Sequence, residues 1–364
     1  MAAMKVQEDI HFGWFIPTGG DTTAYGVPSA TIKPSLEMFV RVAQTAESAG
    51  FEYALVPVQT ACYEAWISCA MIAAQTSTLK LLIAARPGYV QPATMAKMIS
   101  TFDQLSGGRV CINLIAGPGG AEEAAEGLHY EHDSRYAIMD ETVTIMKRLW
   151  TEAGPVNHRG RFFQLEDGRI RPKPLQQPHP PFYLGGVSAA AIEVCGKHAD
   201  VYLTWLDTPE RVAREFAQAK EAAARHGRAD DLRLGVRAQI LVREREEDAR
   251  RDAEALTARA PKHLKNAIRG MWEQSEANTR MKELAASADL WIGPHLWAGV
   301  TAVRPGAGVL IVGTPDQVAG TLRTYVELGA SEFCLSGYPH DEEAERFGRW
   351  VMPQFKGLAA TPQR

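Results

Sequence analysis

Short apolar runs alternate with amphipathic segments along most of the chain. In the amphipathic segments, apolar residues recur every three or four positions, which is the spacing of a helix with one buried face. The apolar runs have the length of strands, and the run VCINLIA is nearly continuous, which is typical of a strand covered on both faces. Predicted strands cover residues 12–17, 53–57, 79–84, 110–116, 182–184, 201–204, 233–242 and 334–336.

A predicted helix follows each of these strands. The helices cover residues 35–49, 64–75, 93–104, 135–150, 188–196, 208–227 and 246–259, and a last one begins at 341. Parallel strands need crossover connections of this kind. Eight such units in 364 residues fit a closed (β/α)8 TIM barrel, an α/β fold, better than an open doubly wound sheet.

Two stretches exceed this plan. The Gly- and Pro-rich residues 154–181 predict an excursion with a small hairpin. The longest surplus, at about 260–331, separates the seventh and eighth strands and contains a capping box at Thr314 and Gln317. We predict a single domain over residues 1–364 with this insertion.

Composition and charge narrow the class of protein. A net charge of -4 offers no global field for nucleic acid or an anionic membrane. The five cysteines are an odd number without metal-like spacing, which suits reduced thiols and no metal site. No run reaches the roughly 20 apolar residues of a membrane helix, and no apolar signal core opens the chain. These features favour a cytoplasmic protein.

One arginine stands alone in a glycine-rich stretch. Arg304 is the only formal charge between residues 290 and 314, LWIGPHLWAGVTAVRPGAGVLIVGT. A guanidinium stays protonated and is costly to bury unpaired, so this residue predicts an anion nearby, either a carboxylate of the chain or a ligand. The later segment CLSGYPH, with Tyr338 and His340, would meet it in a loop that closes over an anionic substrate.

In a barrel of this type the site lies at the carboxyl ends of the strands. Gly185, Gly186 and Ser188 lie between the fifth strand and its helix, where free N–H groups would suit a phosphate, although a tight turn explains them equally well. The GPGG loop at 117–120 is a weaker sign of the same kind. Arg237 on the seventh strand would hold an anion or pair with a carboxylate of the barrel.

Other candidates have an ordinary alternative. Cys62 is a possible nucleophile or a small apolar side chain. His132, Arg135 and Tyr136 open the fourth helix and would touch a ligand or form an exposed cap. Trp205 and Tyr338 would wall a flat ligand or belong to the core.

At this point the motifs resemble a known family. The chain is similar over nearly its whole length to the bacterial luciferase-like flavin-dependent monooxygenases, and within them to the alkanesulfonate monooxygenases. The resemblance is carried by FIPTGGD, CYEAW, DQLSGGR, HDSRY, KPLQQPHPPFYLGG, VYLTW, LWAGVTAVRPGAG and LSGYPH. The last two are the specific ones for the sulfonate branch.

The resemblance implies a function and a set of site residues. Such enzymes take reduced FMN (FMNH2) from a separate NAD(P)H-dependent flavin reductase and use O2 to cleave a C–S bond, giving sulfite and an aldehyde. Asn113, Tyr136, Gly186 and Ser188 would hold the flavin. Arg237 and Arg304 would grip the sulfonate, with Arg304 on a mobile loop, and Cys62 and Tyr338 would lie beside flavin and substrate. Trp205, Gln239 and His340 complete the predicted substrate site. Family members pair through helices beside the second and third strands, so a homodimer or homotetramer is expected.

One departure changes the expected substrate. The family pattern on the seventh strand is Arg-x-His, whereas this chain has Arg237-Ala238-Gln239. An amide hydrogen-bonds but does not donate a proton as histidine does. A hydroxylated sulfosugar such as sulfoquinovose therefore competes with a simple alkanesulfonate. The alternatives are a two-component flavin monooxygenase acting on a sulfone, amine or heterocycle, a deazaflavin-dependent dehydrogenase, and a non-catalytic binding protein.

Overall fold

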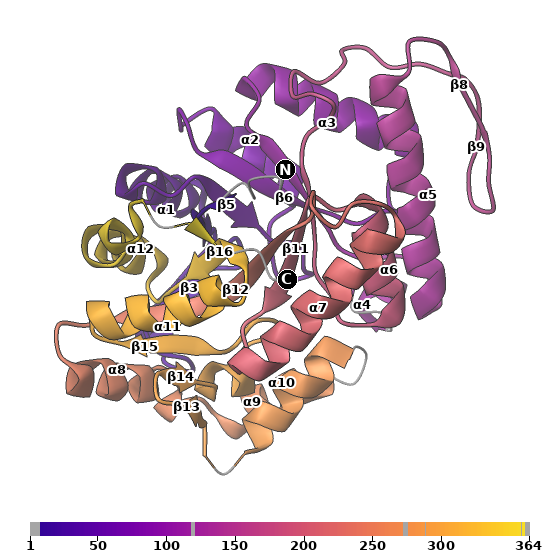
Figure 1. Ribbon diagram of the computed structural model, residues 1–364. Coiled ribbons are helices and arrows are strands. Elements are labelled where there is room, and N and C mark those ends of the chain that lie inside the picture. Colours follow the sequence, from indigo (N-terminus) through magenta and orange to yellow (C-terminus); the bar gives the residue numbers. More distant parts are fainter. Residues whose placement is uncertain (1–7, 118–120, 272–275, 288, 358, 361–364) are drawn as a thin grey trace.

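Eight parallel strands close into a barrel in the computed structural model, which describes residues 8–117, 121–271, 276–287, 289–357 and 359–360 (Figure 1). Closure follows from two pairings, because β11 pairs with β12 and β16 returns to β2. The predicted (β/α)8 TIM barrel is confirmed. In sheet order the strands are β2 (His11–Phe15), β5 (Tyr53–Val56), β6 (Lys80–Ala85), β7 (Val110–Leu114), β10 (Phe182–Leu184), β11 (Val201–Trp205), β12 (Arg233–Val242) and β16 (Ala330–Ser336).

Helices surround the barrel, and local sequence signals set their ends. The Ser35 hydroxyl accepts from Met38 N at the first turn of α1, and Gly50 ends that helix at φ 94°. The predicted capping box of Thr314 and Gln317 opens α11. The helices of the ring are α1 (Leu36–Ala49), α2 (Ala65–Ala73), α3 (Pro92–Ser106), α5 (His132–Thr151), α6 (Ala189–His198), α7 (Pro209–Arg225), α11 (Pro315–Glu327) and α12 (His340–Trp350).

One helix differs from its predicted place. The charged segment 246–259 was expected to be the seventh barrel helix, and it forms α8 (Glu246–Ala258). However, α11 packs against α7 and β16, whereas α8 packs against β15 (Leu310–Gly313). The strand β15 adds to the end of β12, and α8 lies against this addition.

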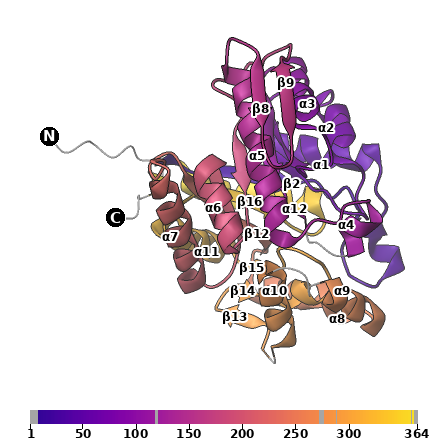
Figure 2. The same cartoon turned by 90° about the vertical axis from the view of Figure 1, so that its right-hand side faces the viewer.

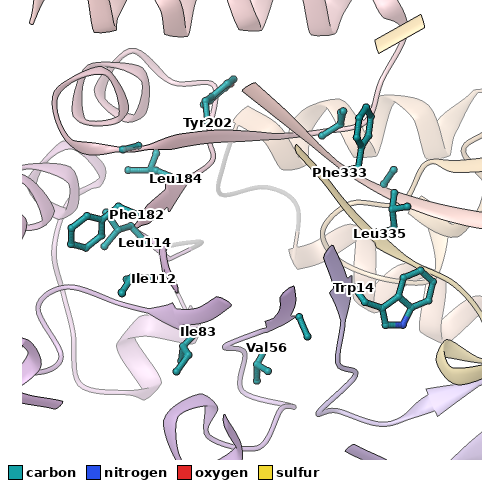
Figure 3. Close-up of a cluster of buried hydrophobic side chains, with 14 of the residues drawn as sticks. Trp14, Val56, Ile83, Ile112, Leu114, Phe182, Leu184, Tyr202, Phe333 and Leu335 are labelled. Carbon is teal, nitrogen blue, oxygen red and sulfur yellow. The ribbon is translucent and has the colours of Figure 1, made fainter. Parts of the chain in front are cut away.

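Side chains alternate between two cores along the strands. Residues that point away from the barrel axis pack under the helices, and Figure 3 shows this layer with Trp14, Ile112, Phe182 and Phe333 among its members. The alternate residues fill the interior with Phe15, Tyr53, Leu55, Leu82, Cys111, Tyr183, Val201, Leu203 and Cys334. Arg237 and Ser336 share the inward parity of β12 and β16 and lie toward the carboxyl end of the barrel.

The longest connection lies between β12 and β16, as predicted, although it begins at residue 243 instead of about 260. Its strand β15 pairs in parallel with residues 239–242 of β12, and β14 (Leu296–Trp297) and β13 (Trp291–Gly293) follow antiparallel. This small sheet therefore extends the carboxyl rim of the barrel (Figure 2). The connection also holds α9 (Lys262–Met271), α10 (Glu276–Ala286) and the 3-10 helix η3 (Gly299–Ala302).

Smaller elements complete the chain. The predicted hairpin forms from β8 (Val156–Arg159) and β9 (Gln164–Gly168), and it lies far from the long connection in both views (Figures 1 and 2). A second short ribbon, β3 (Asp21–Thr22) and β4 (Thr31–Ile32), follows β2. The short helix α4 (Ala121–Ala125) follows β7. Within the described residues, no helix is long and apolar enough to span a membrane.

Candidate functional site

Two arginines from distant parts of the chain meet at one aromatic ring. The guanidinium carbon of Arg237 lies 4.8 Å from the ring centre of Phe15, and that of Arg304 lies 5.1 Å from the same centre. Phe15 ends β2 and faces the barrel interior. The two cations, here called the arginine pair, therefore gather at the carboxyl end of the barrel, where the sequence analysis expected an anion.

No carboxylate of the described residues forms an ion pair with either arginine. The Arg237 guanidinium donates hydrogen bonds to the Ser336 hydroxyl at 3.0 Å and to the backbone oxygens of Ala238 and Cys334. Arg304 donates to the Ala307 oxygen at 3.4 Å. Burial, and to a smaller extent the charge of Arg304, lower the pKa of Arg237 to about 10. The alternative of an internal ion pair at Arg237 is thus absent from the described structure.

Phenols and a thiol surround Arg304. The Tyr25 hydroxyl donates to the Tyr338 hydroxyl at 2.8 Å. Burial alone would lower the pKa of Arg304, but Tyr338, Tyr25 and Cys62 raise it overall. Burial also raises the pKa of the Cys62 thiol, against the opposing effects of Thr18 and Arg304. The raised pKa of Cys62 favours the neutral thiol over the thiolate that a nucleophile would need.

Gln239 holds the segment that carries Arg304. This segment, residues 299–308, consists of η3 and the residues that lead from it toward β15. The Gln239 side chain is fully buried and its Nε2 donates to the Ala307 oxygen, the same atom that accepts from Arg304. Its Oε1 is buried without a partner among the described residues. Trp205 lies beside this segment, since an ideal Cβ on Gly306 would lie 3.9 Å from Trp205 Cζ2.

A buried carboxylate–imidazole pair adjoins this cluster. Asp21 Oδ1 lies 2.8 Å from His340 Nδ1, and Asp21 Oδ2 accepts from His340 N at 2.8 Å. The His340 ring lies 5.7 Å from the Phe15 ring and 5.3 Å from the Tyr338 ring, measured between centres. Burial would raise the pKa of Asp21, but its interactions with His340 and the hydrogen bond from Thr22 N outweigh burial and lower that pKa. Asp21 therefore remains a carboxylate at neutral pH.

The predicted flavin residues form a second cluster beside β10. Gly186 has φ 130°, and a Cβ there would meet Ala191 Cβ at 2.8 Å and Tyr136 Oη at 3.3 Å. The Ser188 hydroxyl caps α6 by accepting from Ala191 N at 3.3 Å. Asn113 is buried on β7 in register with Tyr183 of β10. These residues leave close backbone access and a helix N-terminus at the strand ends, a combination that suits a phosphate.

Other polar side chains at this end of the barrel have ion-pair or ring partners within the chain. Arg135 pairs with Glu123 at 3.1 Å, which supports a structural role for it, and His132 packs on Tyr136. Arg86 is likewise neutralised, by Glu122 and Glu126. Residues 118–120 of the GPGG loop lie outside the described part of the chain.

Sequence reasoning missed Phe15, Asp21 and Tyr25 as site residues. Asp21 ends the quoted motif FIPTGGD, so its position after the first strand was a usable signal. Phe15 and Tyr25 carried none, because an aromatic residue in a strand or loop reads as core.

Closed barrels with polar side chains gathered at the carboxyl ends of the strands are the architecture of barrel enzymes. Residues 10–332 match the family model described as luciferase-like monooxygenase, so the chain belongs to that family.

Solved structures share the fold at low sequence identity. The chain is similar to riboflavin lyase RcaE, with a TM-score of 0.82, 17% identity and coverage of 98% of this chain and 94% of that one. For the EDTA monooxygenase EmoA from Chelativorans sp. BNC1, the TM-score is 0.77 at 19% identity, with coverage of 97% of this chain and 95% of that one. For an F420-dependent secondary alcohol dehydrogenase, the TM-score is 0.68 at 16% identity, with coverage of 94% of this chain and 98% of that one. At these identities the likeness extends to the fold alone.

Proposed function

We propose that this protein is an FMNH2-dependent organosulfonate monooxygenase that uses O2 to cleave a C–S bond, releasing sulfite and an aldehyde. The observation that carries this proposal is the arginine pair on Phe15. A sulfonate is a permanently ionised group with three acceptor oxygens, which matches two guanidiniums that hold no internal carboxylate. Family membership supports the monooxygenase part of the proposal.

The residues beside β10 fit FMN. Gly186 provides a cradle that a side chain would fill, and Ser188 with the N-terminus of α6 would hold the phosphate. Tyr136 and Asn113 would contact the rest of the cofactor. When bound, reduced flavin supplies the chemistry that activates O2, while the chain supplies binding, orientation and exclusion of water. The proposal includes a separate NAD(P)H-dependent flavin reductase as partner and a cytoplasmic setting.

The arginine pair and its neighbours would bind and orient the substrate. Arg237 is fixed on a barrel strand, whereas Arg304 depends on segment 299–308. We propose that this segment is the mobile loop that covers the substrate, with Trp205 and Tyr338 as its walls. Cys62, as a neutral thiol, would contribute packing and a weak hydrogen bond rather than nucleophilic attack.

Gln239 points to a hydroxylated sulfonate. Its Nε2 is engaged by Ala307, so only the buried Oε1 remains to accept a hydrogen bond. A carbonyl oxygen of this kind suits a hydroxyl donor, and leaving it unpaired is unfavourable. We therefore propose a sulfosugar such as sulfoquinovose in preference to a plain alkanesulfonate.

We also propose a homodimer or homotetramer that uses α2. This helix is apolar on all sides, AWISCAMIA, yet Ile67 is 69% exposed and Met71 48% exposed. An exposed apolar face of this kind is typical of an interface between subunits.

The test is sulfite release in the presence of FMN, NAD(P)H and a flavin reductase. The proposal expects sulfite from sulfoquinovose at a higher kcat/KM than from octanesulfonate. Release from octanesulfonate alone would overturn the sulfosugar assignment, and no release from a panel of sulfonates of different size would overturn the function.

A further inference from the structure

Resting on the proposed desulfonation, we propose that His340 is a catalytic base positioned by Asp21. In this proposal His340 Nε2 takes the hydroxyl proton of an α-hydroxysulfonate as its C–S bond breaks. The role goes beyond binding, and it assigns a function to Asp21, which the sequence analysis left without one.

Asp21 fixes the orientation of the imidazole. Its carboxylate accepts from Thr22 N, His340 N and His340 Nδ1, each at 2.8 Å. Because the carboxylate accepts at Nδ1, the proton of a neutral ring resides there and Nε2 carries the free lone pair. A carboxylate in this position also stabilises the imidazolium that forms when Nε2 takes a proton.

Nε2 is left without an internal partner. The His340 side chain is only 3% exposed, and its Nε2 is buried with no hydrogen-bond partner among the described residues. Buried polar atoms are normally paired, so an orphan in a side chain held this firmly indicates a ligand contact. A purely structural tie between β3 and α12 would need only Nδ1 and the backbone.

Asp21 and His340 lie beside the proposed anion site. The His340 ring packs on Phe15, the same ring that both guanidiniums contact, and on Tyr338. A sulfonate held by the arginine pair would therefore bring its carbon and that carbon's substituents next to the imidazole. The other ring against it is Trp14, at 6.5 Å between centres.

The proton transfer is balanced without another reactant. In the proposed reaction, one oxygen atom of O2 would enter at the carbon bearing sulfur and give an α-hydroxysulfonate, R–CH(OH)–SO3⁻, while the other would leave as water with the two electrons that reduced FMN supplies. Nε2 takes the hydroxyl proton, the C–O bond becomes a carbonyl, and the C–S electron pair leaves with sulfite. The imidazolium then returns its proton to sulfite or to water.

Several charged or titratable groups surround His340 and define its pH response. Asp21 faces it directly, and the Tyr338 ring meets it edge-on, with the Tyr25 hydroxyl donating a hydrogen bond to the Tyr338 hydroxyl. Three carboxylates on its own helix are engaged elsewhere, since Asp341 pairs with Arg41, Glu342 with Arg346, and Glu343 with Arg243 and Arg346. The remaining groups are the arginine pair and Cys62.

The test uses an α-hydroxysulfonate supplied directly, without flavin. The probes are hydroxymethanesulfonate and the bisulfite adduct of glycolaldehyde, and the measurement is enzyme-dependent sulfite release against pH. The wild-type protein should accelerate sulfite release above the rate in buffer alone. General-base catalysis of this kind contributes about 10²–10⁴-fold.

His340→Asn separates chemistry from structure. The Asn amide reproduces the donor at Nδ1 and keeps the tie to Asp21, but it has no Nε2. It should lower the rate by about 100-fold or more, with sulfate affinity and Tm close to wild type. Asp21→Asn should give a smaller loss. The matched control is His198→Gln, because His198 is a second buried histidine paired with an aspartate, Asp140, in the helix layer.

The outcomes distinguish this inference from the proposed function. A wild-type rate and pH profile in His340→Asn, or no acceleration by the wild-type protein, would overturn the inference. Suppose that the protein releases no sulfite from sulfonates with reduced FMN but still speeds the decay of the hydroxysulfonate adducts. The proposed function then fails, and the assignment of His340 and Asp21 stands. If His340→Asn releases sulfite from sulfonates at the wild-type rate, only the assignment of His340 and Asp21 is overturned.

Discussion

Two positive charges beside one phenylalanine ring repel each other, and this repulsion contributes to a lowered pKa of Arg237. Its pKa falls to about 10 because burial removes water and Arg304 adds a second cation. Arg237 remains protonated at neutral pH, so the repulsion between the two cations destabilises the folded protein when no anion is bound. A bound oxyanion removes the repulsion and gains charge-assisted hydrogen bonds with both groups.

Arg304→Ala should weaken binding of sulfate and of sulfonates by about 10- to 100-fold, since a hydrogen bond to a charged group contributes about 1.5–3 kcal/mol. Calorimetric titration measures the affinity. Arg245→Ala is the control, because Arg245 is exposed and pairs with Glu247 and Asp248 outside the site. Unchanged anion affinity in Arg304→Ala would remove this residue from the site.

At the scale of single elements, periodicity and end signals carry most of the information. The alternation of β12 is visible in RLGVRAQILV, and Ser35, Gly50 and Thr314 mark helix ends at the residues where the structure has them. The place of α8 was not predictable in this way. Whether a charged helix joins the barrel ring depends on β15 adding to β12, which is a contact between segments far apart in sequence.

Gly186→Ala should weaken FMN binding at least tenfold. The substitution forces an L-residue into φ 130° and places a Cβ 2.8 Å from Ala191 Cβ and 3.3 Å from the Tyr136 hydroxyl. Backbone strain alone costs about 1–3 kcal/mol. Quenching of flavin fluorescence measures the affinity, at a temperature where both proteins are folded. Gly320→Ala is the matched control, because a Cβ there meets nothing within 4 Å. Wild-type FMN affinity in Gly186→Ala would argue against this cradle.

The contact of α5 with α6 should depend on pH in the acid range. Burial would raise the pKa of Asp140, but His198 and Lys197 lower it to about 2, so the ionised carboxylate stabilises the fold. This contribution is complete above the ordinary carboxyl pKa of 3.8 and is lost as pH falls toward 2. Because the side chain is 35% exposed, solvent screening reduces it to about 1 kcal/mol. Urea unfolding should therefore find Asp140→Asn less stable than wild type at pH 6 and equal to it near pH 2. A constant difference across this range would contradict the assignment.

For the whole molecule, the count of strand–helix units led to the barrel, and the rule that sites lie at the carboxyl ends of strands led to Arg237, Gln239 and His340. Arg304 came from the absence of other charges in its segment. What the sequence could not supply is which of these side chains meet. Their common partner Phe15 lies more than 200 residues away from either arginine in the chain and carries no charge or motif.

The apolar face of α2 predicts an oligomer at this scale. Ile67→Lys should convert the protein to a smaller species, because a buried unpaired charge at an interface is costly. Light scattering after size-exclusion chromatography gives the mass. Glu254→Lys, at an exposed position on α8, controls for the change of charge. A monomeric wild type, or an unchanged mass in Ile67→Lys, would place the interface elsewhere.

The most direct measurement is a crystal structure of the protein with a bound organosulfonate. The account predicts sulfonate oxygens within hydrogen-bond distance of the guanidiniums of both Arg237 and Arg304, next to Phe15 at the carboxyl end of the barrel. A sulfonate bound away from this ring, or either guanidinium engaged with a carboxylate of the chain in that complex, would contradict it.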